Sequence, residues 1–430
     1  MDPEVIFDGD FLSIFHLIST RDRLQFYQTH HINMNISRLF TLLAVVNLIG
    51  FKATAQNYDE SKVPSYTLPN MLKLSAGEPI EDSNSWEKKR RPEILKLFED
   101  NVYGQVPRDL DSTKFNVKKS ANKVLKNKAL LKEVTITAWK NGKHVQIHLT
   151  LLTPDKRKGP VPTFLLINNR DKSLNDLPKD SASDFWPAEM MIDSGYGIAA
   201  FHVGDAAPDL PEEYQKGVLQ LYPEQLKVRN GMKAIGAWAW AAMTVMDYFE
   251  SDTDIDSKKI ALVGHSRGGK AALWAGAQDQ RFAIVIANCS GNTGAAISRR
   301  KFGETIKAIN SRFPYWFADN YKRYNDNEAA LPIDQHMLIA LIAPRPVYTT
   351  NATDDLWADP TGSYLSILEA AKVYNLYQKK LTLSATPPAV NKPIIKSILG
   401  YHIRDGVHDM TRFDWQQFAR FARYHFSLVE

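Results

Sequence analysis

The feature that most constrains the fold is a serine in a glycine-flanked turn between a strand and a helix. Residues 259–263 have the pattern of a buried strand, and Gly264-His265-Ser266-Arg267-Gly268 follows at once, ahead of an alanine-rich helical stretch through Ala277. In Gly-x-Ser-x-Gly turns the serine backbone is strained, and the glycines leave no Cβ to crowd the adjoining strand and helix. We therefore predict that Ser266 points its hydroxyl out of a sheet at a helix N-terminus. The alternative is a tight turn with an inert serine.

The rest of the chain alternates short apolar or β-branched runs with helix-length segments, which is typical of an α/β protein. The pair Asn141-Gly142 predicts a hairpin, and segment 231–250 predicts a helix with Trp238 and Trp240 in the core. This layout predicts an α/β-hydrolase fold, with a mostly parallel central sheet, helices on both faces and three layers. The expected strands are 133–139, 144–152, 162–168, 197–203, 259–263, 282–288, 346–351 and 394–399.

The N-terminal region has the pattern of an export signal. From Met34, a short positive region is followed by the apolar run 39–51 and by Ala53-Thr54-Ala55, a small-x-small cleavage site. The apolar run is too short for a membrane span. We expect 1–33 to be an upstream segment absent from the biological product, 34–55 a signal peptide, 56–120 an N-terminal extension packed on the main domain, and 121–430 the catalytic domain. The alternative to the signal peptide is a buried N-terminal helix. The expected location is therefore secreted or periplasmic.

Composition excludes several classes of protein. The chain is 44% apolar and 23% charged, which excludes disorder, and its net charge of +5 is mild for a nucleic-acid binder. The basic runs 88–91 and 299–301 are expected on solvated helix surface, or, as the weaker hypothesis, against an acidic polysaccharide. The single cysteine, Cys289, excludes an intrachain disulfide and a cysteine-based zinc site. No dinucleotide, Walker or His-Glu-x-x-His motif occurs, so the sequence gives no support to dinucleotide, nucleotide or zincin chemistry.

A serine nucleophile needs an imidazole base, and the base needs an orienting carboxylate. In the α/β-hydrolase fold, the acid follows the serine along the chain and the histidine follows the acid. Two histidines lie close after the expected last strand, and we favour His408, in a glycine-containing loop before the final helix, over His402, which abuts the strand end.

The loop after strand 346–351 carries three aspartates within six residues, where the fold expects the acid. We choose Asp355, with Asp354 and Asp359 as alternatives. Asp359 precedes Pro360 and has the pattern of a helix N-cap followed by an N1 proline.

Several motifs together resemble the bacterial glucuronoyl esterases of carbohydrate esterase family fifteen, from about Trp86 to the C-terminus. The motifs that carry the resemblance are Gly264-His265-Ser266-Arg267-Gly268-Gly269-Lys270, residues 288–296 (Asn-Cys-Ser-Gly-Asn-Thr-Gly-Ala-Ala), residues 331–336 (Leu-Pro-Ile-Asp-Gln-His), residues 343–348 (Ala-Pro-Arg-Pro-Val-Tyr), residues 355–360 (Asp-Leu-Trp-Ala-Asp-Pro), and residues 400–402 (Gly-Tyr-His) through His408-Asp409.

The resemblance implies cleavage of the ester between 4-O-methyl-glucuronic acid on xylan and lignin alcohols, without a metal or an organic cofactor. It implies Ser266 as nucleophile, His408 as base and Arg267 as an oxyanion stabiliser. It also implies that Lys270, Glu304 and Trp357 contact the glucuronate; the alternative for Lys270 and Glu304 is an exposed, solvated position. The expected partner is glucuronoxylan or a lignin–carbohydrate substrate, without nucleic acid or membrane span, and the expected state is a monomer.

The chain departs from the family pattern at Cys289, where many members carry the triad glutamate. A thiol is a poor partner for an imidazolium, so we expect Asp355 to supply the orienting charge. Two alternative functions remain open. One is an acetylxylan or other carbohydrate O-acetyl esterase, which could use the same triad, and the other is a carbohydrate-binding homologue with impaired catalysis.

Overall fold

The computed structural model describes residues 56–175, 183–379, 381 and 383–427. The predicted upstream segment and signal peptide, residues 1–55, lie outside this range. The described part belongs to one unit, Gln56–Glu430. Among the described residues, no helix is both long and apolar enough to cross a membrane.

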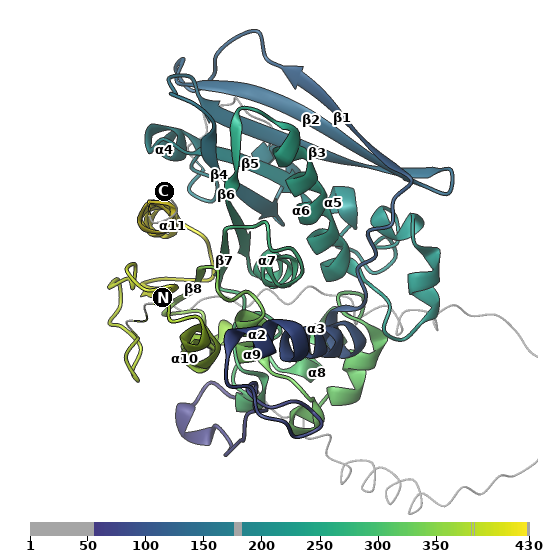
Figure 1. The fold of residues 1–430 in the computed structure, drawn as a ribbon, viewed down its shortest axis with the longest axis vertical. Helices are drawn as coiled ribbons and strands as arrows, with labels where there is room; N and C mark the ends of the chain where they lie inside the picture. The colour runs from purple at the N-terminus through teal and green to yellow at the C-terminus, as the bar shows by residue number, and fades with distance from the viewer. Residues whose placement is uncertain (1–55, 176–182, 380, 382, 428–430) are drawn as a thin grey trace, which may run out of the picture. The chain divides into compact units, whose positions relative to one another are not determined.

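A central sheet organises the described part of the chain (Figure 1). Its order is β1-β2-β3-β5-β4-β6-β7-β8-β9; the strands from β5 through β4 to β9 are parallel, and β1, β2, β3 and β5 pair antiparallel. The strands are β1 (Ser112–Lys119), β2 (Ala129–Lys140), β3 (Lys143–Pro154), β4 (Val161–Asn168), β5 (Gly197–His202), β6 (Ile255–His265), β7 (Ile284–Asn288), β8 (Val347–Ala352) and β9 (Leu399–Arg404).

Helices cover both faces of this sheet, as predicted for an α/β-hydrolase fold. Along β4, Phe164 and Leu166 pack into the cluster with α4 and α11, whereas Leu165 and Ile167 pack into the cluster with α6, α7, α9 and α10. Side chains that alternate along a strand therefore build two cores. The helices are α2 (Ser83–Ser85), α3 (Arg91–Phe98), α4 (Ala188–Asp193), α5 (Val203–Ala206), α6 (Ala234–Ser251), α7 (Arg267–Gln278), α8 (Ile306–Arg312), α9 (Gln335–Ala340), α10 (Pro360–Leu376) and α11 (Arg412–Phe426).

Two strand predictions were wrong. The edge strand β1 was missed because its sequence is polar and most of its side chains are exposed, so it lacks an apolar face. The last strand runs over Leu399–Arg404 rather than 394–399, because Leu399 pairs in register with Val347 of β8. Strand β1 lies within 56–120, the expected N-terminal extension, and pairs with β2 of the expected catalytic domain.

The prediction that both basic runs are solvated was wrong for their arginines. Arg90, Arg91, Arg299 and Arg300 are all buried. Arg91, for example, donates to the carbonyl oxygens of Ala277 and Leu341. A guanidinium can be buried in this way because backbone carbonyls and carboxylates satisfy its fork of donors.

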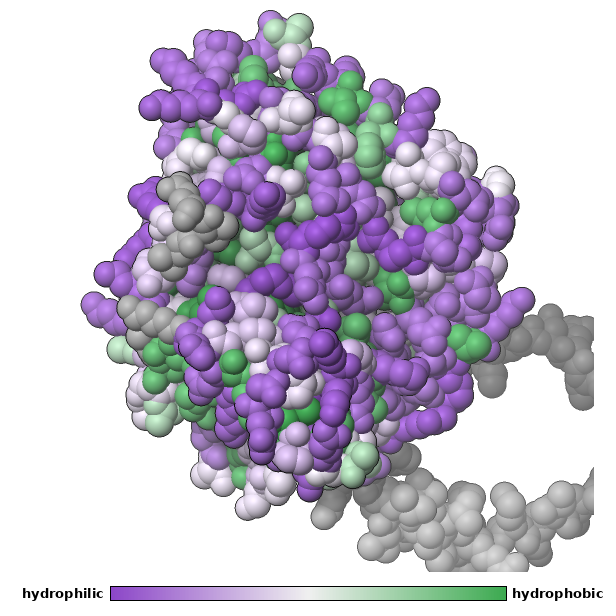
Figure 2. Space-filling view, viewed as in Figure 1, coloured by the Kyte–Doolittle hydropathy of each residue, from purple (hydrophilic) through white to green (hydrophobic). Residues whose placement is uncertain are grey.

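The tryptophans of the segment 231–250 lie where the sequence predicted. Trp238 and Trp240 are on α6 and are fully buried. The face drawn in Figure 2 is mainly hydrophilic, with small hydrophobic patches scattered over it. That face offers no continuous apolar surface.

Candidate active site

Ser266 occupies a strained turn between β6, which ends at His265, and α7, which begins at Arg267. Its backbone angles are φ 54° and ψ −123°, a conformation that costs a non-glycine residue free energy. A Cβ on Gly264 would overlap the carbonyl of Gly268, so the glycine is required where strand and helix meet. The Ser266 N–H donates to the carbonyl of Asn288 at 2.8 Å, which ties the turn to the end of β7.

The predicted site residues come together around one cavity of about 310 Å³. They arrive from separate segments, at or beyond the carboxyl ends of the parallel strands β6, β7, β8 and β9. This edge of the sheet is where ligands bind in open α/β proteins. The predicted residues that line the cavity are Ser266, Arg267, Lys270, Glu304, Asp355, Trp357 and His408.

The loops after β8 and β9 bring a carboxylate to a histidine. Oδ2 of Asp355 lies 2.5 Å from Nδ1 of His408. The Asp355 side chain is buried, with 2% exposure, whereas 37% of the His408 side chain is exposed. The carboxylate is thus shielded, and the imidazole remains open on the side of the cavity.

The other two aspartates of this loop make different contacts. Asp354 is exposed. Asp359 accepts a hydrogen bond from the Gly362 N–H, which confirms the predicted N-cap of α10, and its Oδ2 pairs with Nε of Arg300 at 2.9 Å. Asp355 is therefore the aspartate of this loop that contacts His408.

His402, the alternative base, lies within β9 and is fully buried. Its Nε2 is 2.8 Å from Oδ1 of Asp414, and its Nδ1 is 2.9 Å from the hydroxyl of Tyr348. Both ring nitrogens therefore have partners in the core. The sequence predicted that the last strand ends at residue 399, which placed His402 just beyond the strand. The strand in fact extends to Arg404 and includes His402.

The Arg267 side chain is anchored by residues that sequence reasoning missed. Its guanidinium forms an ion pair with Asp209, and its CZ atom lies 5.0 Å from the ring centroid of Trp316. Asp209 also accepts hydrogen bonds from Tyr315 and from the indole of Trp316. No motif marks Asp209 in the sequence, so no sequence signal could have found this contact. The Nε atom of Arg267 is buried and has no hydrogen-bond partner among the described residues.

Lys270 and Glu304 form a buried pair, so the alternative of exposed, solvated positions was wrong. The Lys270 Nζ lies 2.6 Å from Oε2 of Glu304 and 2.9 Å from the carbonyl of Ser290, and it also donates to the carbonyl of Asn292. These three acceptors match the three donors of an ammonium group. Burial lowers the pKa of Lys270, although the charge of Glu304 opposes that shift.

Cys289 follows β7 and lies beside the His408–Asp355 pair. Its side chain is buried, and burial, followed by the charges of Asp355 and Asp414, raises the pKa of the thiol well above its ordinary value. The protonated thiol carries no charge that could orient an imidazolium. The negative charge next to His408 therefore comes from Asp355 and not from Cys289.

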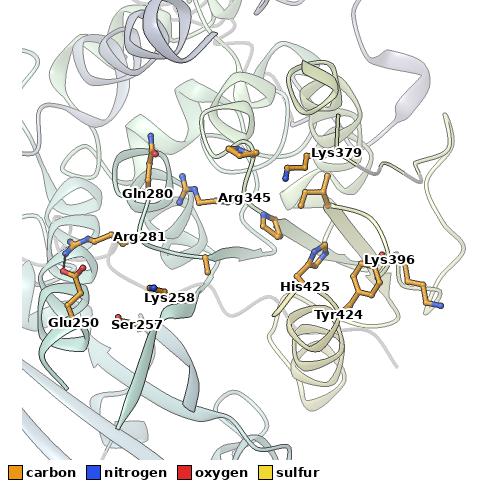
Figure 3. Close-up of a pocket in the computed structure, with 14 residues that line it drawn as sticks. Glu250, Ser257, Lys258, Gln280, Arg281, Arg345, Lys379, Lys396, Tyr424 and His425 are labelled. Carbon is orange, nitrogen blue, oxygen red and sulfur yellow. Dashed lines mark hydrogen bonds and ion pairs between the residues drawn. The ribbon is translucent and has the colours of Figure 1, made fainter. Parts of the chain in front are cut away.

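A second cavity, of about 650 Å³, lies near the starts of β6, β8 and β9, at the opposite edge of the sheet (Figure 3). Its lining includes Ser257 and His425. The Nε2 atom of His425 contacts the carbonyl of Ser397, and burial lowers the pKa of this histidine to about 4. A ring whose basicity is lowered by burial and whose Nε2 already contacts the backbone is a poor base for Ser257, so the cavity at Ser266 is the candidate active site.

Comparisons with known proteins agree on one family. A family model for glucuronyl esterases of fungi matches residues 136–377. The carbohydrate esterase MZ0003, from an unknown prokaryotic organism, is 40% identical over 402 residues, which cover 86% of this chain and 92% of that protein.

Two solved structures agree with this result. A promiscuous CE15 esterase from a marine bacterial metagenome has a TM-score of 0.77 and 40% identity, with 86% of this chain and all of that chain covered. A glucuronoyl esterase from Solibacter usitatus has a TM-score of 0.79 and 38% identity, with the same coverage.

Proposed function

The chain belongs to the glucuronoyl esterase family and is a carboxylic ester hydrolase, and from that membership we propose its substrate and mechanism. The proposed substrate is the ester between 4-O-methyl-glucuronic acid of glucuronoxylan and a lignin alcohol. The proposed catalytic residues are Ser266, His408 and Asp355. The observation that carries the proposal is the His408–Asp355 hydrogen bond, in the same cavity as a serine held in a strained turn.

The reaction would proceed through an acyl-enzyme. Ser266 Oγ attacks the uronoyl carbonyl carbon while His408 takes the serine proton on Nε2, the ring nitrogen that does not face Asp355. The carboxylate of Asp355 holds the Nδ1–H and stabilises the imidazolium. The bond from the carbonyl carbon to the alcohol oxygen then breaks, and the imidazolium protonates the departing alcohol. Water, deprotonated by His408, attacks the acyl-enzyme and releases the uronic acid and Ser266.

The oxyanion would be held by groups at the start of α7. Backbone N–H groups of a first helical turn have no partner within the helix and can donate to a developing negative charge. The Arg267 guanidinium adds positively charged N–H donors, and its ion pair with Asp209 and its contact with Trp316 fix it before the substrate arrives.

The sugar would be bound by Glu304 and Trp357, with Lys270 behind them. The Glu304 carboxylate can accept from sugar hydroxyls, and the Trp357 indole can lie against a pyranose face. Because the Lys270 donors already meet three acceptors, we propose that Lys270 acts chiefly by fixing the Glu304 carboxylate at the cavity wall.

The test is hydrolysis of a glucuronate benzyl ester by the wild-type chain and by Ser266→Ala. We expect the variant to lose turnover while its circular dichroism and thermal unfolding match the wild type. A serine-reactive fluorophosphonate should label the wild type and not the variant. Retained turnover by Ser266→Ala would rule out the mechanism.

A carbohydrate O-acetyl esterase is the second candidate, because one structural relative is described as promiscuous. Glucuronate esters and acetylated xylan assayed side by side would separate the two activities. Turnover of the acetyl ester alone would favour the second candidate. Fluorophosphonate labelling would argue against the third possibility, a binding protein with impaired catalysis.

The site of action that fits such a substrate is outside the cytoplasm. We propose that residues 34–55 direct export and that cleavage after Ala55 leaves Gln56 as the first residue of the mature chain. N-terminal sequencing of the exported protein tests this; a chain that retains residues 34–55 after export would contradict it.

A further inference from the structure

Three side chains of different chemistry meet at the cavity: the Cys289 thiol, the Asp355 carboxylate and the His408 imidazole. Each offers one metal-ligating atom, and the three atoms lie within 4.8 Å of one another. All three residues line the cavity, so an ion entering it can reach them. We propose that this cluster is an inhibitory site for Zn²⁺, against the expectation that a chain with a single cysteine has no cysteine-based zinc site.

The donor set suits zinc. Zn²⁺ takes thiolate, imidazole and carboxylate ligands at about 2.0–2.3 Å, which places neighbouring ligand atoms about 3.2–3.8 Å apart. The ligand atoms therefore need only small movements: separations near 4.8 Å must close, and the 2.5 Å contact between Asp355 Oδ2 and His408 Nδ1 must open to admit the ion. Three protein ligands and a water in the fourth position form a common zinc arrangement, and the cavity supplies room for that water.

The three ligands come from three loops, which follow β7, β8 and β9. The parallel sheet holds these loops at one edge, so the cluster exists before the ion binds. The Cys289 backbone N–H donates to the Thr350 carbonyl at 2.8 Å, which fixes the thiol beside the loop that carries Asp355. Binding forms a Zn–S bond and releases the thiol proton to water, and coordination through Nδ1 of His408 moves the proton of that nitrogen to Nε2.

Cys289 provides the zinc affinity of this cluster. The Asp355–His408 pair alone offers two ligand types that are shared with many serine hydrolases. The thiolate adds a third ligand of the soft type that zinc favours. A chain with glutamate at this position would offer a harder oxygen ligand and bind Zn²⁺ more weakly.

Bound zinc would stop hydrolysis by occupying the base and its orienting carboxylate. An imidazole that ligates Zn²⁺ and a carboxylate that ligates the same ion cannot pass a proton between serine and substrate. Inhibition should be reversible, and a chelator should restore activity. The expected inhibition rests on the proposed function, whereas the expected binding of Zn²⁺ does not.

The test combines direct binding with activity. Isothermal titration of the wild-type chain with ZnCl₂ should give one site, and Cd²⁺ as a probe should produce the ultraviolet absorption band of a cadmium–thiolate bond. Cys289→Ala and Cys289→Ser should lose that band and weaken Zn²⁺ binding by at least about tenfold. Asp354→Asn, in the same loop but exposed, is the matched control and should bind Zn²⁺ like the wild type.

The outcomes separate this inference from the proposed function. Titration without a binding event, or equal Zn²⁺ binding by wild type and Cys289→Ala, would overturn the site. Zinc binding that depends on Cys289, in a chain that does not hydrolyse glucuronate esters, would keep the site and refute the proposed function. Inhibition of the wild type and of Cys289→Ala at the same Zn²⁺ concentration would show that zinc inhibits elsewhere.

Discussion

Oδ2 of Asp355 lies 2.5 Å from Nδ1 of His408, although 53 residues separate the two along the chain. Their strands explain the contact. Strands β8 and β9 are parallel neighbours, with Thr350 beside His402, so both chains leave the sheet at the same edge. The loop after β8 reaches Asp355 within three residues, and the loop after β9 reaches His408 within four.

The first prediction concerns this contact. Asp355→Asn should lower kcat by a factor on the order of 10³ to 10⁴, because the amide no longer holds the Nδ1–H tautomer or stabilises the imidazolium. Asp354→Asn should leave kcat near the wild-type value, because the Asp354 side chain is exposed. Steady-state kinetics of both variants on a glucuronate ester provides the measurement; equal losses would refute the assignment of Asp355.

The second prediction concerns Arg267. Arg267→Gln should lower kcat by roughly 10²-fold with little change in KM, because the guanidinium is proposed to act on charge that develops in the transition state. Asp209→Asn should give a smaller loss in the same direction, because it removes only the ion pair that positions the guanidinium. Arg312→Gln is the control, since Arg312 also lines the cavity but is exposed. A rise in KM alone for Arg267→Gln would assign Arg267 to substrate binding instead.

The third prediction concerns the serine turn. Gly264→Ala should lower the free energy of unfolding by about 3 kcal/mol, because its Cβ would overlap the backbone of Gly268 and Gly269. Gly159→Ala should have little effect, since an added Cβ there meets nothing within 4 Å. Urea unfolding of the two variants measures the difference. A wild-type stability for Gly264→Ala would show that strand and helix can separate at this point.

The fourth prediction concerns pH. Burial lowers the pKa of His425 from 6.5 to about 4 in the folded chain. Between these values the unfolded chain binds a proton that the folded chain does not, so the free energy of unfolding falls as the pH drops from 6.5 towards 4. His425→Gln should reduce this loss by about 2 kcal/mol between about pH 7.5 and about pH 4.5.

Urea unfolding at the two pH values measures this effect. His144→Gln is the control, because the His144 side chain is exposed, and it should keep the wild-type pH dependence. An unchanged pH dependence in His425→Gln would mean that other buried groups cause the acid destabilisation.

Sequence reasoning succeeded where neighbours along the chain determine the structure. The serine turn depends on Gly264, Gly268 and a few apolar residues before them, and these contacts are local. The N-cap at Asp359 is local in the same sense, because its carboxylate accepts from the Gly362 N–H three residues on. Short continuous apolar or β-branched runs predicted most strands, because a strand in a sheet that is covered on both faces has apolar side chains on both.

Sequence reasoning failed where the interacting residues are far apart along the chain. Strand β1 has no apolar face of its own and is recognisable only through its pairing with β2. The buried Arg91 is satisfied by carbonyls about 190 and 250 residues away, which no local pattern encodes. The Asp209–Arg267 ion pair also joins segments that are distant in sequence.

The sequence by itself determined the fold class, the strained serine and a short set of acids and histidines that could serve it, since periodicity and turn chemistry operate over a few residues. Only the tertiary structure decided that Asp355 contacts His408 and that Cys289 lies beside this pair. It also decided that the ring nitrogens of His402 are hydrogen-bonded in the core. The physical reason is that hydrogen bonds and ligand geometry depend on ångström-scale distances, which arise only when the strands have paired in register and brought distant loops to one edge of the sheet.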